Sequence, residues 1–142
     1  MQWDDSPNAG FSRPDVDDLW LPIAANYKEV NVASELKDPR SFLNFYRKLL
    51  ATRKATPALL WGDYASHDLQ SSEAQQNCFV FERRTEDQQI LVALNFSGQD
   101  QALSLPGLVR GRIILSTRMD REDEVDLASF TLRANEGCII AL

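Results

Sequence analysis

The apolar periodicity of this chain changes once, near Pro57, and this change constrains the fold more than any other feature. Before Pro57, five apolar residues recur at i, i+3, i+4, i+7 and i+8, the spacing of one helical face: Phe42, Phe45, Tyr46, Leu49 and Leu50. After Pro57, short apolar runs separated by turn residues recur with a period of about 2. The sequence therefore predicts one amphipathic helix followed by an all-β region.

The predicted helix covers residues 42–54. Asp38 is expected to cap its N-terminus, with Pro39 at the first helical position, where the missing N–H costs nothing. Pro57 is expected to end the helix. Burying each apolar side chain of the stripe is worth about 1.5–3 kcal/mol, so the helix needs a large surface to pack against.

The β region carries several short predicted strands: residues 59–61, 64–67, 77–82, 89–96, 102–105, 111–115, 130–132 and 138–142. Residues 89–96 are apolar throughout their centre and are the best candidate for a central strand. No helical pattern lies between these runs, and such spacing is typical of an antiparallel sandwich or barrel. The predicted fold is mainly β, an antiparallel β-sandwich preceded by an irregular segment and one helix.

Residues 1–30 show no periodicity but contain four large aromatic residues: Trp3, Phe11, Trp20 and Tyr27. Disordered linkers are poor in aromatic residues, so we expect an ordered loop whose partner surface lies elsewhere. Long structureless stretches are uncommon inside a compact domain, which favours a chain that begins in mid-structure. Asn31 is expected to cap a short helical turn over residues 31–36.

The composition excludes several classes of partner. The chain has 142 residues and a net charge of −6, which argues against binding to nucleic acid or to an anionic membrane. An uncharged ligand such as a sugar remains compatible. No signal peptide and no apolar run of transmembrane length is found, so a cytoplasmic location is expected.

Few residues outside the opening loop are candidates for a catalytic, metal-binding or disulfide role. His67, the only histidine, is expected to be a solvated polar residue, and the acidic residues 120–126 lack the spacing of a calcium loop and predict a solvated surface loop. Cys78 and Cys138 lie in apolar runs and are expected to be small buried residues, with their pairing left open. No metal and no cofactor are expected.

Several segments resemble the α-glucosidases and oligo-1,6-glucosidases of glycoside hydrolase family 13, in the α-amylase superfamily. They are residues 1–12 (MQWDDSPNAGFS), 20–22 (WLP), 26–32 (NYKEVNV), 45–49 (FYRKL) and 91–97 (LVALNFS). The resemblance extends over the whole chain, and it is most specific in the first fifty-five residues. It identifies the chain as similar to the C-terminal fragment of such an enzyme.

The resemblance implies a place within a larger enzyme, which has a (β/α)8 barrel followed by an antiparallel β-domain. Residues 1–57 would be the end of the barrel, namely the loop after its eighth strand and its last helix, and residues 58–142 the β-domain. The family's retaining hydrolysis of α-glucosidic bonds uses an aspartate nucleophile and a glutamate acid/base that lie upstream, so no catalytic residue is expected here. Gln2, Trp3, Asn8 and Phe11 would be substrate-proximal in the parent enzyme.

The resemblance also implies the partners. They would be the barrel domain, which the β-domain would stabilise, and an oligosaccharide substrate in the full-length enzyme only. Two alternatives stay open: a free-standing β-sandwich that binds carbohydrate, and a module that self-associates through the exposed helix face. Trp61 is the only tryptophan in the β region and lies in an apolar run, which gives the first alternative little support. The sequence leaves open which glucosidic linkage the parent enzyme would act on, and whether it would be a hydrolase, a transglucosylase or an isomerase.

Overall fold

The chain folds into two compact units, Met1–Arg47 and Lys48–Leu142. A computed structural model describes residues 1–67, 69 and 72–142. The division between the units falls inside helix α2 (Phe42–Ala55), upstream of the domain boundary predicted after residue 57. Each unit is described below by itself.

The first unit is an irregular loop with two short helices, η1 (Pro7–Gly10) and α1 (Val32–Glu35). The side-chain oxygen of Asn31 accepts a hydrogen bond of 2.8 Å from the Ser34 N–H, which confirms the predicted cap. The first two N–H groups of α1, those of Val32 and Ala33, donate to the carbonyls of Gln2 and Trp3 over 2.9 Å each. The start of the loop is thereby tied to its end.

Helix α2 begins at Phe42, and the predicted cap at Asp38 is wrong. The Asn44 N–H donates to the hydroxyl of Ser41 over 3.3 Å, and the Leu43 N–H donates to the carboxylate of Glu35 over 3.0 Å. Asp38 instead closes a turn, in which its side chain accepts from the Arg40 N–H over 2.9 Å. Because Ser41 and Glu35 satisfy the first free N–H groups, the helix starts three residues after Pro39.

The apolar stripe of α2 is open to solvent. Phe42, Tyr46 and Leu50 are 75%, 58% and 61% exposed, and no residue of the helix is buried. The helix ends at Ala55, as Pro57 predicted, and Pro57 opens a second helix, α3 (Pro57–Trp61). Residues 59–61 were expected to form a strand, and this expectation is wrong because Pro57 is placed at the start of a helical turn, where its fixed φ is favourable.

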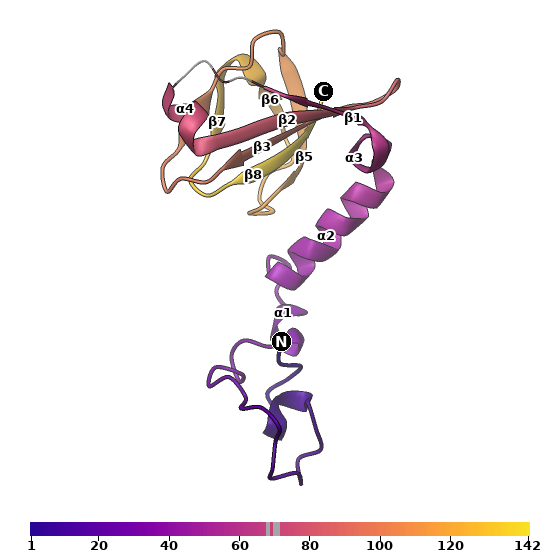
Figure 1. Cartoon of the computed structure of the whole chain (residues 1–142), viewed down its shortest axis with the longest axis vertical. Helices are drawn as coiled ribbons and strands as arrows, with labels where there is room; N and C mark the ends of the chain where they lie inside the picture. The colour runs from indigo at the N-terminus through magenta and orange to yellow at the C-terminus, as the bar shows by residue number, and fades with distance from the viewer. Residues whose placement is uncertain (68, 70–71) are drawn as a thin grey trace. The chain divides into compact units, whose positions relative to one another are not determined.

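The second unit is an antiparallel β-sandwich, as expected (Figure 1). A six-stranded sheet has the order β1-β2-β3-β8-β5-β6 and faces a two-stranded sheet of β4 and β7. The strands are β1 (Asp63–Ser66), β2 (Cys78–Arg84), β3 (Gln89–Asn95), β4 (Gln101–Leu103), β5 (Arg110–Ser116), β6 (Glu124–Asp126), β7 (Phe130–Leu132) and β8 (Gly137–Ala141). Two short helices complete the unit, α4 (Ser72–Asn77) and η2 (Leu127–Ser129).

Strand β3 is central, as predicted, and lies between β2 and β8. Its alternate residues face two different apolar clusters. Leu91 and Ala93 belong to the core between the sheets, together with side chains of β4, β7 and β8, whereas Ile90 and Val92 pack on the outer face against Ala58 of α3. Burial on both faces explains why the strand is apolar without alternation.

The acidic segment 120–126 is not wholly a solvated loop. Glu124–Asp126 forms β6, which pairs with β5, and Asp120 receives two hydrogen bonds from Arg133, of 2.8 and 2.6 Å. The expectation of a solvated loop is therefore wrong for these residues. The segment carries few β-branched residues, and only pairing with β5, distant in sequence, fixes it as a strand.

His67 is half-buried rather than solvated, which corrects the expectation for this residue. Its Nε2 lies 2.5 Å from a carboxylate oxygen of Glu82, whose side chain is only 4% exposed. Cys78 and Cys138 are free thiols on β2 and β8. Strand β3 separates them by two strand spacings, about 9.5 Å, which is too far for a disulfide.

Candidate functional site

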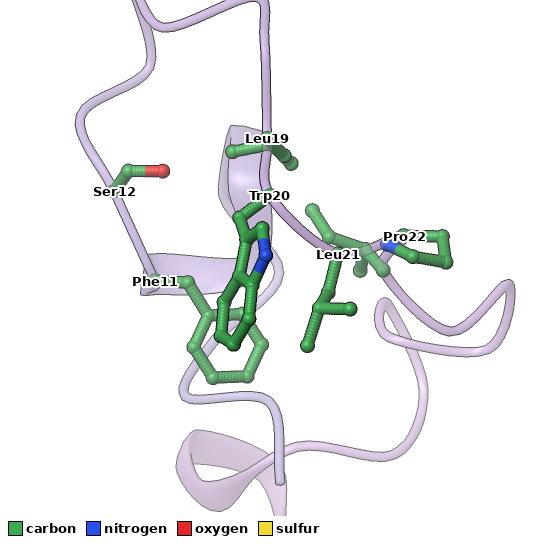
Figure 2. A pocket seen from close by; sticks show the side chains of 7 residues that line it. Phe11, Ser12, Leu19, Trp20, Leu21 and Pro22 are labelled. Carbon is green, nitrogen blue, oxygen red and sulfur yellow. The ribbon is translucent and has the colours of Figure 1, made fainter.

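An apolar pocket of about 400 Å³ lies within the opening loop. Figure 2 shows its lining, in which Phe11 and Ser12 follow η1, and a later stretch of the loop supplies the rest: Leu19, Trp20, Leu21, Pro22 and Ile23. Trp20 is 93% exposed and Phe11 is 55% exposed. Aromatic faces beside a few hydroxyl and amide groups are the usual lining of a small-molecule site.

A sharp turn positions Phe11. Asn8, Ala9 and Gly10 all have positive φ, of 65°, 52° and 72°, a conformation that side chains disfavour. The Asn8 amide holds the turn by donating to the carbonyls of Arg13 and Val16 over 2.8 and 2.9 Å. A Cβ on Gly10 would lie 2.8 Å from Cβ of Trp3, so only glycine fits there.

The four residues predicted to be substrate-proximal are placed differently from one another. Phe11 lines the pocket. Trp3 is 57% exposed, and its backbone joins the turn to α1. Gln2 donates from Nε2 to the side-chain oxygen of Asn26 over 3.3 Å, and the amide of Asn8 is used within the turn. Among the described residues, Phe11 is thus the one of the four that shares a pocket with other aromatic and apolar side chains.

Trp20 is the second aromatic residue of this pocket, and unlike Phe11 it was not among the predicted site residues. The signal was present, because the segment 20–22 (WLP) was among the family-like stretches. A tryptophan in an aperiodic loop is expected to pack against something, yet this indole is nearly fully exposed. Its exposure beside Phe11 makes it a candidate for ligand contact.

The two buried acidic groups of the β-sandwich, Glu82 and Glu136, are arranged for pairing rather than for proton transfer. Burial alone would raise the pKa of Glu82, but hydrogen bonds from Arg84, Gln89 and His67 outweigh it and lower the pKa. Burial would likewise raise the pKa of Glu136, and hydrogen bonds from Arg133 with the charge of Arg121 lower it. A general acid for glycoside hydrolysis requires the opposite shift, because it must stay protonated near neutral pH.

Two further properties follow from the described part of the chain. Among residues 1–67, 69 and 72–142, no three His, Cys, Asp or Glu side chains are grouped closely enough to hold a metal ion. Over the same residues, no helix combines the length and the apolar composition needed to cross a bilayer.

Comparison with known proteins assigns both parts of the chain. Residues 1–62 match the family profile described as "Alpha amylase, catalytic domain", and residues 69–136 match the profile "Maltogenic Amylase, C-terminal domain". An aperiodic loop and a helix that end a catalytic domain, followed by an antiparallel β-sandwich, define the C-terminal part of a glycoside hydrolase of α-amylase type.

Individual relatives agree with this class. The chain is 33% identical to an oligo-1,6-glucosidase of Parageobacillus thermoglucosidasius, over 96% of this chain and 24% of the relative. It is 37% identical to the α-glucosidase MAL12 of Saccharomyces cerevisiae, over 98% of this chain and 23% of the relative. The crystal structure of the trehalulose synthase MutB from Pseudomonas mesoacidophila MX-45 superposes with a TM-score of 0.79 at 30% identity, covering 99% of this chain and 24% of that one.

The chain belongs to glycoside hydrolase family 13, the α-amylase family. It spans about a quarter of the length of the relatives it matches.

Proposed function

We propose that this chain serves as the C-terminal part of a retaining α-glucosidase that hydrolyses α-glucosidic bonds of oligosaccharides. One observation carries the proposal: residues 1–62 match the profile of a catalytic domain, yet the apolar stripe of α2 within them is uncovered. The oligo-1,6-glucosidases and α-glucosidases among the relatives support the substrate class. The catalytic carboxylates would lie on a barrel outside residues 1–142.

The occupant of the α2 stripe would be that barrel. Phe42, Tyr46 and Leu50 are each more than half exposed, and covering each is worth about 1.5–3 kcal/mol. A stripe one helix long suits a helix that packs on the outside of a (β/α)8 barrel. Self-association through this face is the alternative occupant, and it predicts a chain whose sedimentation coefficient rises with concentration. Two results together would support the barrel as the occupant: this chain stays monomeric at high concentration, and the stripe is buried in the longer enzyme.

The β-sandwich would stabilise the barrel through its outer face. Tyr64, Phe79 and Phe96 are 55%, 44% and 73% exposed. The ring of Phe81 stacks obliquely between those of Tyr64 and Phe79, at centroid distances of 5.5 and 5.4 Å. Aromatic side chains gathered in this way are typical of a surface that a further domain covers.

The opening loop would form one wall of the substrate cleft. Phe11 lines its pocket, Trp3 is exposed, and the Asn8 amide would support the wall by holding the turn before Phe11. Gln2 would complete the wall as a neighbour of Asn26. The free thiols Cys78 and Cys138 support a reducing, cytoplasmic location for the enzyme, where such thiols are stable.

Two measurements test this function. The purified chain should release no p-nitrophenol from p-nitrophenyl α-glucoside above the uncatalysed rate, because retaining hydrolysis needs two carboxylates about 5–5.5 Å apart across the sugar. The in-frame coding sequence upstream of residue 1 should encode a barrel with three acidic catalytic residues, and that longer protein should hydrolyse the substrate. Enzyme-like activity of the chain alone, or an upstream sequence without a barrel, would contradict the proposal.

A further inference from the structure

A second, polar groove lies within the β-sandwich unit. It is an open groove of about 430 Å³, lined by Trp61, Asp63, Arg84, Thr85 and Glu86. Three elements meet here: the end of α3, the start of β1, and the turn that follows β2. Trp61 lies in an apolar run of the sequence, yet the residue is 71% exposed at this groove.

The backbone beneath the groove is closely packed and hydrogen-bonded. Gly62 lets the end of α3 lie directly against β2, because a Cβ there would come 2.5 Å from the Ala58 carbonyl and 2.9 Å from the backbone nitrogen of Arg84. Asp63 stands directly opposite Arg84 in the ladder between β1 and β2. The turn after β2 is closed by the Thr85 N–H, which donates to the Gln88 carbonyl over 2.8 Å. The groove is thus built on paired elements rather than on a free loop.

Among the charged side chains of the groove, that of Arg84 has a partner within the sheet. The Arg84 guanidinium donates to Glu82 over 2.7 Å, and Glu82 is itself buried. With Arg84 already paired to Glu82, Asp63 and Glu86 leave the groove with negative charge and several free hydrogen-bond acceptors. This arrangement disfavours anions such as phosphates.

We propose that this groove binds a neutral oligosaccharide, with one sugar ring against the indole of Trp61. The apolar C–H face of a hexose matches an exposed indole face, while its hydroxyl groups match carboxylate acceptors and guanidinium donors around it. Asp63 and Glu86 accept from sugar hydroxyls, and Arg84 donates to a sugar oxygen. The site lies wholly in the β-sandwich and shares no residue with the pocket of the opening loop.

Titration of the purified chain with maltotetraose and with isomaltotriose, followed by tryptophan fluorescence, tests the site. The chain contains three tryptophans, so each must be separated from the others. Wild type should give a saturable change. Trp61→Ala should abolish that change, and calorimetry should show binding at least about tenfold weaker, a loss of about 1.4 kcal/mol. Phe96→Ala, which removes a comparably exposed ring of the β-sandwich that does not line the groove, should leave the affinity unchanged.

A matched pair of variants tests whether Glu86 accepts hydrogen bonds from the sugar. Glu86→Gln should weaken binding, whereas Asp87→Asn should not, because Asp87 is an exposed neighbour that does not line the groove. Far-UV circular dichroism and the urea midpoint should match wild type for Trp61→Ala, since that side chain is mostly exposed.

Three outcomes would overturn the site: no saturable signal with either sugar, unchanged affinity in Trp61→Ala, or loss of binding in Phe96→Ala. The result does not depend on the hydrolytic activity of a longer enzyme, which the p-nitrophenyl α-glucoside assay tests separately.

Discussion

The guanidinium of Arg121 donates to the carboxylate of Glu136 over 2.7 Å, and the Glu136 side chain is fully buried. Arg133 donates to the same carboxylate over 2.5 Å and also pairs with Asp120. The Arg133 backbone N–H adds a further bond of 2.9 Å. This cluster joins the segment before β6 to the turn before β8, and it neutralises a charge that burial would otherwise make costly.

We expect Glu136→Gln to destabilise the β-sandwich strongly. The substitution keeps the shape of the side chain but leaves the guanidinium groups of Arg121 and Arg133 without their shared counter-charge. Breaking a buried ion pair in this way costs about 3–5 kcal/mol of unfolding free energy. Urea denaturation followed by circular dichroism measures the change. The control Glu122→Gln, at an exposed site, should stay within about 0.5 kcal/mol of wild type, and equal losses in both variants would refute the role of the cluster.

Acid should weaken the fold through three carboxylates. Hydrogen bonds from Arg133 lower the pKa of Asp120 to about 2 from its ordinary value of 3.8, and the pKa values of Glu82 and Glu136 are also lowered. The unfolded chain therefore binds more protons in this window, so stability should be complete above about pH 5 and decline toward about pH 2. Urea midpoints across this range measure the decline. Asp120→Asn should flatten its acidic end, and a midpoint that rises on acidification would contradict the assignment.

Gly62→Ala should destabilise the β-sandwich unit. The added methyl group would lie 2.5 Å from the Ala58 carbonyl and 2.9 Å from the backbone of Arg84, so both the last turn of α3 and its approach to β2 must change. Such overpacking costs about 1–3 kcal/mol, measurable by thermal or urea unfolding. Gly98→Ala is the matched control, because nothing lies within 4 Å of its added Cβ. If both alanine variants unfold like wild type, the close approach at Gly62 is not required.

The two thiols should differ in reactivity. Burial raises the pKa of Cys138 to about 11, with a contribution from the charge of Glu136, whereas Cys78 is only half-buried. Because the thiolate is the reactive form, Cys78 should be labelled first by N-ethylmaleimide, and Cys138 only after unfolding in urea. Peptide mapping by mass spectrometry assigns each site. Equal labelling in the native chain would contradict the difference in burial between the two thiols. A Cys78–Cys138 disulfide in non-reducing digests would be inconsistent with the placement of β3 between them.

The substitution Leu50→Gln should show whether the apolar stripe of α2 is covered in a longer enzyme but exposed in this chain. In this chain Leu50 is 61% exposed, so Leu50→Gln should change the unfolding free energy by no more than about 0.5 kcal/mol. In the longer enzyme that we propose, the same change should lower the melting temperature, because the side chain would be covered by the barrel. Differential scanning calorimetry of both proteins makes the comparison, and an identical response in the two would argue against a covered stripe.

Local patterns in the sequence predicted much of the fold. The helical spacing from Phe42 to Leu50 and the end of the helix before Pro57 were found correctly, as were most strands. The central place of the strand predicted over residues 89–96 was also correct, and β3 covers Gln89–Asn95 of it. One error was local, since Pro57 starts a helix over residues that were predicted as a strand, and the other errors fall where a more distant partner decides. Residues 124–126 become a strand only beside β5, and the start of α2 depends on the carboxylate of Glu35, eight residues before Leu43.

The site residues divide in the same way. Phe11 could be proposed from its motif, whereas the exposure of Trp20 and Trp61 could not be, because an aromatic residue in an apolar run predicts burial. Glu82 occupies the same face of β2 as Val80, and that alternation could have marked it as buried. Its partners His67 and Gln89 could not be named without the register of β1, β2 and β3.

The sequence by itself determined most of the helical, extended and irregular segments, because those preferences arise from apolar periodicity, proline and capping residues within a few positions of one another. The tertiary structure alone decided that Arg121 meets Glu136, that Trp61 opens onto a polar groove, and that Cys78 and Cys138 stay apart. Those contacts depend on strand order and register, which bring together residues far apart along the chain, and no local preference encodes such pairings.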